Sequence, residues 1–121
     1  MNQAQDTKIY DLEARTFEFA REARSFISKL PKTIISIEDS KQLVRSSGSI
    51  GANYIEANEA LSKKDFYMRI KICRKETKET IYWLKLLYLN DQELNETRLT
   101  LINEATQLMK IFGSIITNSK I

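Results

Sequence analysis

One segment of the sequence decides the fold: Arg45-Ser-Ser-Gly-Ser-Ile-Gly-Ala-Asn-Tyr-Ile-Glu-Ala-Asn-Glu-Ala-Leu-Ser-Lys-Lys-Asp-Phe66. Its first half repeats apolar or small residues at spacings of three and four, which is the period of an α-helix facing a bundle core. Gly48 and Gly51 lie inside this half, where a glycine costs roughly 1 kcal/mol relative to alanine. We therefore expect a neighbouring element to approach this helix closely at the glycines.

The second half of the segment predicts where the next helix begins. Ser62-Lys-Lys-Asp65 has the form of a capping box, in which the serine hydroxyl and the aspartate satisfy the first free amides of a helix. Pro31 predicts an earlier stop, and Asn90-Asp91 a later one. Together these signals predict four helices, at about residues 11–29, 38–61, 63–89 and 95–118. Short connections favour antiparallel neighbours, so we predict one all-α domain over residues 1–121, an antiparallel up-down-up-down four-helix bundle.

Each predicted helix has an apolar stripe that would face the core. The stripes comprise Leu12, Phe19, Ala23, Phe26 and Leu30; Leu43, Ser47, Ile50, Tyr54, Ala57 and Leu61; Phe66, Ile70, Cys73, Thr77, Ile81, Leu84 and Tyr88; and Leu99, Ile102, Ala105, Leu108, Met109, Phe112, Ile115 and Ile116. Cys73 is the only cysteine of the chain, and its place on a stripe predicts a buried thiol that packs as a small hydrophobe and takes no part in chemistry.

The composition argues against catalysis. The chain has no histidine, and it lacks a glycine-rich phosphate loop and a Cys-x-x-Cys pair, so we predict no catalytic residue and no cofactor. Glu56, Glu59, Glu76 and Glu79 could in principle hold a metal, but ion pairs with neighbouring lysines are the favoured interpretation, and we predict no metal site. Residues 1–8 are polar and do not resemble a signal peptide, and no apolar run approaches the roughly 20 residues of a membrane span, which predicts a cytoplasmic protein with no membrane partner. With no catalytic motif in the sequence, we also predict no small-molecule substrate.

Positive charge is concentrated in the third predicted helix. The formal net charge is +3, and residues 63–85 contain eight Lys/Arg against three Asp/Glu, a local net charge of +5. On a helical wheel one flank of this helix interleaves cations with aromatic rings. These residues are Tyr67, Lys71, Arg74, Lys75, Lys78, Tyr82 and Lys85, and we call them the basic flank. Cations neutralise phosphates and rings can stack on unpaired bases, so the flank is a candidate nucleic-acid site; a solvated helix surface is the alternative interpretation.

Two further sets of residues suggest contacts between subunits. Met68, Ile72 and Trp83 form an apolar face on the opposite flank of the third helix, which we interpret either as an oligomer interface or as packing over a bundle edge. Arg45, Ser49, Asn53 and Glu56 form a polar row on the second helix, which is either a surface hydrogen-bond ladder or a seam between subunits. The small surface around Gly48 and Gly51 is assigned to the same predicted interface.

The decisive segment also resembles a known family. Leu43-Val-Arg-Ser-Ser-Gly-Ser-Ile-Gly-Ala-Asn-Tyr-Ile-Glu-Ala57, followed by Ser62-Lys-Lys-Asp-Phe66, is similar to the four-helix-bundle family named for proteins encoded in intervening sequences of bacterial 23S ribosomal RNA genes. The family's pattern falls on Arg45, Ser49, Ile50, Asn53 and Glu56, and Glu79 is similar to the glutamate of its third helix. The sequence departs from the pattern at Asn58, where a glycine is frequent, and at Cys73-Arg-Lys-Glu76, where small residues are frequent.

The resemblance implies a ring-like homo-oligomer, most commonly a homopentamer, and no activity. A related branch, the accessory variability protein of diversity-generating retroelements, is a basic pentamer that binds nucleic acid. We therefore expect a non-enzymatic bundle that self-associates and binds RNA or a ribonucleoprotein through the basic flank. The alternative is a scaffold that contacts only protein.

Overall fold

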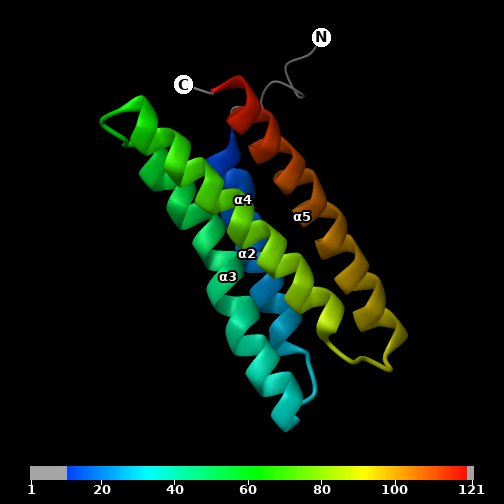
Figure 1. The fold of residues 1–121 in the computed structure, drawn as a ribbon. Coiled ribbons are helices and arrows are strands. Elements are labelled where there is room, and N and C mark those ends of the chain that lie inside the picture. Colours follow the sequence, from blue (N-terminus) through cyan, green and yellow to red (C-terminus); the bar gives the residue numbers. More distant parts are fainter. Residues whose placement is uncertain (1–10, 120–121) are drawn as a thin grey trace.

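The computed structural model describes residues 11–119, which form four helices and no strand. They are α2 (Leu12–Ser28), α3 (Ile34–Asn58), α4 (Lys63–Leu86) and α5 (Gln92–Asn118). Figure 1 shows the four rods lying side by side, and its colours show that each helix runs opposite to the one before it. This confirms the predicted all-α bundle. The polar segment 1–8, from which localisation was predicted, lies outside the described residues.

Three of the helices begin at a side chain that caps the free backbone amides. The Thr33 hydroxyl accepts a hydrogen bond from the Ser36 amide at 3.1 Å, and the Ser62 hydroxyl accepts one from the Asp65 amide at 3.0 Å. The Asp91 carboxylate accepts from the Leu94 amide at 2.9 Å. Such caps stabilise a helix start by typically about 1 kcal/mol. The capping box predicted at Ser62 is confirmed in its serine half.

The caps also explain where the predicted boundaries were wrong. The second helix begins four residues earlier than expected because Thr33, two residues after Pro31, is its N-cap. It ends at Asn58 rather than residue 61, since the amides of Glu59 and Ala60 close turns onto α3 carbonyls. The third helix ends at Leu86 rather than residue 89. The fourth begins at Gln92 rather than residue 95, because Asp91 is its N-cap.

The core lies along the axis of the bundle, where the predicted stripes meet. Its largest fully buried side chains are Phe19, Phe26, Phe112, Leu12, Leu43, Ile50, Ile70, Leu84 and Leu108. Three predicted core residues are exposed instead: Leu61 at 99%, Tyr88 at 80% and Leu99 at 64%. Leu61 and Tyr88 follow the ends of α3 and α4 and so leave the stripe, whereas Leu99 lies on the solvent side of α5, where Leu101 faces the core.

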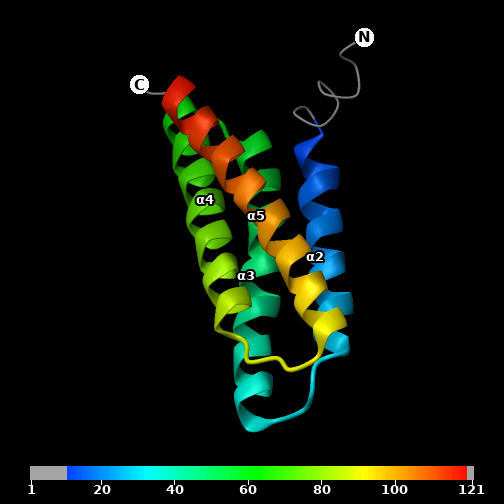
Figure 2. The same cartoon turned by 90° about the vertical axis from the view of Figure 1, so that its right-hand side faces the viewer.

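The helices pack in chain order around the core, so that α3 lies against α4 and α4 against α5. Helix α2 packs mainly on α3, and it closes the bundle against α5 over a smaller contact; Figure 2 shows α2 on the opposite side of α5 from α4. Arg15 links α2 to α5, because its Nε lies 2.7 Å from Oε2 of Glu104 and its Nη2 donates to Gln107 at 3.0 Å. The partnership with Glu104 raises the pKa of Arg15.

The close approach predicted at the glycines occurs between α3 and α2. A Cβ atom added at Gly51 would lie 2.9 Å from Oγ1 and 3.3 Å from Cβ of Thr16 on α2. At Gly48 an added Cβ would lie 3.0 Å from a guanidinium nitrogen of Arg24, the movable end of a long side chain. Both glycines therefore face a helix of the same chain, and this packing accounts for their presence.

Candidate nucleic-acid interface

Helix α4 presents the basic flank on its outer surface. The side chains of Lys71, Arg74, Lys75, Lys78 and Lys85 are exposed. Tyr82 is 56% exposed, whereas Tyr67 is half-buried and packs against the core. The flank borders α5, because Ile116 of α5 lines the same cavity as Lys71, Arg74, Lys75 and Lys78. The predicted cations thus share one continuous surface.

Four of these cations surround a shallow cavity. Lys71, Arg74, Lys75 and Lys78 line it together with Glu79, and Ile116 of α5 contributes an apolar wall. Its volume is about 400 Å³. One carboxylate among four cations leaves the cavity strongly positive, which suits an anionic ligand such as a phosphate group.

Most of the flank's charge is not neutralised within the bundle. Of the carboxylates in residues 11–119, none lies within 4.0 Å of Lys71, Arg74, Lys78 or Lys85. Lys75 alone has such neighbours, since its Nζ lies 3.9 Å from Glu76 and 4.0 Å from Glu79. Both ion pairs are long, and the Lys75 side chain is 66% exposed, so these pairs contribute little to stability. The cations are therefore available to an external anion.

The two rings of the flank occupy different environments. The Lys71 ammonium lies 5.3 Å from the centroid of the Tyr67 ring, within the range of a cation–π contact. Tyr82 packs on Trp83 with centroids 5.1 Å apart and an interplanar angle of 78°, an edge-to-face pair. The sequence placed both tyrosines on the flank, but it gave no indication that only Tyr82 has a widely exposed ring.

The polar row of α3 makes its contacts within the chain, against α4. Arg45 bonds to Glu76 at 3.2 Å and to Glu79 at 3.0 Å. Arg69 donates to Oδ1 of Asn53 at 3.0 Å, and Nδ2 of Asn53 in turn donates to Ser49 at 2.9 Å. We call these contacts the α3–α4 polar seam. The sequence pattern is compatible with a surface hydrogen-bond ladder or with a seam between subunits. In the structure, Arg45 and Asn53 of the row bond to α4 of the same chain.

The fourth member of the row, Glu56, is exposed and makes no side-chain hydrogen bond to a residue of the described chain. Its assignment to a subunit interface stays a prediction. The carboxylates considered for a metal likewise do not gather: within residues 11–119 no group of three potential ligands comes together. Glu76 and Glu79 are instead bonded to Arg45.

The apolar face of α4 is partly open. Met68 is 49% exposed, while Ile72 and Trp83 are half-buried and Trp83 packs against the core. Leu86, which the helical pattern did not single out, is 48% exposed and lies four residues beyond Tyr82 on the outer side of the helix. Trp83 thus covers a bundle edge, while Met68 and Leu86 leave apolar surface that the bundle does not cover.

The predicted burial of Cys73 is confirmed. Its side chain is fully buried, and its thiol lies 3.5 Å from the carbonyl oxygen of Ile50 on α3. Burial raises the pKa of the Cys73 thiol to about 12, so at neutral pH it is protonated and a poor nucleophile.

In residues 11–119 no helix has the length and hydrophobicity of a membrane span.

Comparison with known proteins supports a single family. The family of 23S rRNA-intervening sequence proteins matches residues 8–114. A crystal structure of a protein of unknown function from Bacteroides thetaiotaomicron, described as a member of the S23 ribosomal protein family, is similar with a TM-score of 0.77 and 33% sequence identity. The similarity covers 91% of this chain and 98% of the other. No curated protein matches the chain.

Proposed function

Because this chain belongs to the family of 23S rRNA-intervening sequence proteins, we propose that it is a non-enzymatic cytoplasmic bundle that assembles into a closed ring and binds RNA or a ribonucleoprotein through the basic flank. The family name connects the protein with ribosomal RNA genes. The surface of α4 supplies the physical argument for the RNA contact.

The observation that carries the proposal is the group of cations around the α4 cavity. Lys71, Arg74 and Lys78 have no carboxylate of residues 11–119 within ion-pair distance, and all three line the same cavity. Each cation that neutralises a phosphate releases condensed counterions, which drives binding and makes it salt-dependent. The surface of a soluble protein typically intersperses charges of both signs, whereas this cavity has four cations and one carboxylate.

Assembly would follow from the apolar face of α4. Met68, Ile72 and Leu86 leave apolar area that the bundle does not cover, and a second copy of the chain would cover it. The number of copies that we propose is five. A ring would repeat the basic flank once per subunit, so that several weak phosphate contacts act together on one RNA.

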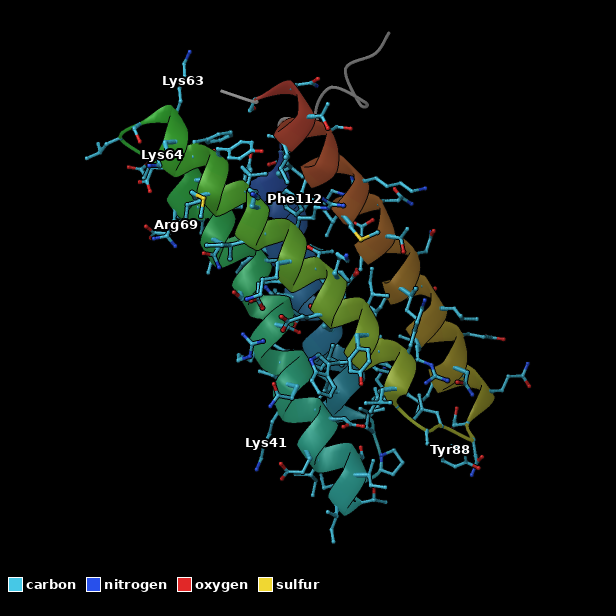
Figure 3. All side chains as sticks on the ribbon, viewed as in Figure 1. Lys41, Lys63, Lys64, Arg69, Tyr88 and Phe112 are labelled. Atoms are coloured by element: carbon cyan, nitrogen blue, oxygen red, sulfur yellow. The ribbon has the colours of Figure 1, made fainter. Side chains whose placement is uncertain are left out.

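A salt titration of RNA binding tests the proposal. Replacing Lys71, Lys75 and Lys78 together with glutamine should weaken binding and reduce the slope of log K against log salt by about one unit for each phosphate that is no longer neutralised. The matched control replaces Lys29, Lys32 and Lys41, three exposed lysines near the junction of α2 and α3, and so removes the same charge elsewhere. Figure 3 shows Lys41 near the opposite end of the bundle from Lys63 and Lys64.

Both triple variants should retain the helix content and the mass of the wild type, as measured by circular dichroism and light scattering. We expect the control to bind RNA almost as the wild type does. Equal weakening in the two variants would show that only net charge matters. Unchanged binding in the α4 variant would leave the protein-only scaffold as the function.

A further inference from the structure

Single-stranded RNA is bound most effectively by proteins that offer a series of ring faces to successive bases. Tyr67 is poorly placed for this, because its ring lies between the core and the ammonium group of Lys71. Tyr82 does have an exposed ring. This ring is attached 11 residues after Lys71, which is about 16 Å farther along the helix. The basic flank thus offers one exposed ring and no stacking platform.

The cations, in contrast, follow the helix over most of its length. Lys64 precedes Lys71 by seven residues, and Lys85 follows Lys78 by seven, so both lie within about 20° of those residues around the helix. All four side chains are exposed, and Figure 3 shows Lys63 and Lys64 at the N-terminal end of α4. From Lys64 to Lys85 the row extends about 32 Å along a straight helix.

A rigid row of charges suits a rigid row of phosphates. We infer that the basic flank selects double-stranded over single-stranded RNA, contacting the sugar-phosphate backbone across the wide, shallow minor groove of an A-form helix. The inference rests on the proposed function and specifies its substrate class. It assigns Lys64, which the predicted flank did not include, to the RNA-binding surface.

The energetics favour the duplex for two reasons. On double-stranded DNA each neutralised phosphate contributes a salt slope of about 0.9, against about 0.7 on a single strand, because the duplex has the higher charge density; an RNA duplex likewise has a higher charge density than its separate strands. A single strand must also be ordered on binding, and stacking, worth about 1 to 3 kcal/mol per base, normally offsets that cost. With one exposed ring, the flank can supply such stacking for one base at most.

The test compares a blunt RNA duplex of about 20 base pairs with each of its two strands, which are chosen to have no internal pairing. Binding of the full-length protein is measured by fluorescence anisotropy at fixed salt. We expect the duplex to bind at least about tenfold more tightly than either strand. A tenfold difference in affinity corresponds to about 1.4 kcal/mol, which is within the range of the stacking energy of one base. Lys64→Gln should reduce the salt slope for the duplex by about one unit.

Tyr82→Ala separates the two binding modes without touching a cation. We expect it to change duplex affinity by less than about twofold, since phosphate contacts dominate there. Equal or tighter binding of the single strands, or a tenfold loss of duplex affinity in Tyr82→Ala, would overturn the inference while leaving RNA binding itself in place. Failure of both RNA forms to bind would remove the proposed function, and this inference with it.

Discussion

Arg45 on α3 and Glu76 on α4 form an ion pair in which the carboxylate is buried and the guanidinium is half exposed: their side chains are 7% and 52% accessible, and Nη1 lies 3.2 Å from Oε1. The partly exposed guanidinium of Arg45 thus neutralises a carboxylate that has little contact with water. A second bond from the same guanidinium to Glu79, at 3.0 Å, holds it across the two helices. The guanidinium thus connects α3 to two carboxylates of α4.

Arg45→Ala should therefore destabilise the fold more than an ordinary surface substitution. The change leaves the Glu76 carboxylate buried without its main cation, and we expect a loss of about 1 to 3 kcal/mol in the free energy of unfolding. Denaturant unfolding measures it. In a Glu76→Gln background the same change should cost much less, because no buried charge is left unpaired. Equal costs in the two backgrounds would show that the pair is unimportant.

Gly51→Ala should destabilise the protein although alanine is the better helix former. The new methyl group would lie 2.9 Å from the Thr16 hydroxyl, so α2 must shift, at a cost of about 1 to 3 kcal/mol. Gly113 provides the matched control, since an added Cβ there meets nothing within 4 Å. Gly113→Ala should stabilise the protein by roughly 0.5 to 1 kcal/mol through helix propensity. Thermal unfolding of both variants distinguishes packing from propensity.

A pair of charges on the apolar face should dissociate the proposed ring. Met68→Glu with Ile72→Glu introduces charges into a contact that would otherwise exclude water, and subunits should separate while each bundle stays folded. Light scattering at tens of micromolar, roughly the range in which a modest interface persists, gives the mass. The control is Ile34→Glu with Ile35→Glu, which places the same two charges on exposed apolar residues at the N-terminal end of α3, away from the apolar face of α4. This control should not change the mass. A wild-type protein that is already a monomer would contradict the assembly proposal.

The buried thiol of Cys73 should make stability fall in alkaline solution. Its pKa is about 12 in the folded protein and near 9.0 in the unfolded chain, so between these values the unfolded state binds fewer protons. Stability is therefore unaffected below about pH 8 and then decreases, on the order of 1 kcal/mol per pH unit above pH 9. The difference between wild type and Cys73→Ala in guanidinium unfolding, measured from pH 7 to 10.5, isolates this contribution from lysine and tyrosine titration. A difference that does not vary with pH would show that the thiol is accessible to water.

Sequence patterns were sufficient for the number and order of the helices, because apolar periodicity and capping residues are local signals. Gly51 was also informative, since a glycine inside a helix implies close packing. The identity of its neighbour was not available, because Thr16 is distant in the sequence. The polar row on α3 was visible for the same local reason, but the pairing of Arg45 with Glu76 and of Asn53 with Arg69 depends on the register between α3 and α4.

The candidate site was predicted in part for similar reasons. Helical spacing placed the cations of α4 on one flank, and the structure places them on one surface. Burial of Tyr67 depends on how α4 packs against the rest of the bundle, which periodicity alone does not determine. Exposed apolar residues at helix ends, such as Ile34 and Ile35, were missed because a pattern of spacings does not distinguish a covered end from an open one.

The small contact between α2 and α5 has a consequence for synthesis on the ribosome. Of the helices in residues 11–119, α2 is made first, yet one of the helices it packs on, α5, is completed only at Asn118. The apolar stripe containing Leu12, Phe19 and Phe26 therefore cannot be enclosed until α5 has been translated. A nascent chain stalled before α5 would keep this stripe open to chaperones or to other nascent copies, so α2 is made before the other three described helices but is fully covered only when the last of them is complete.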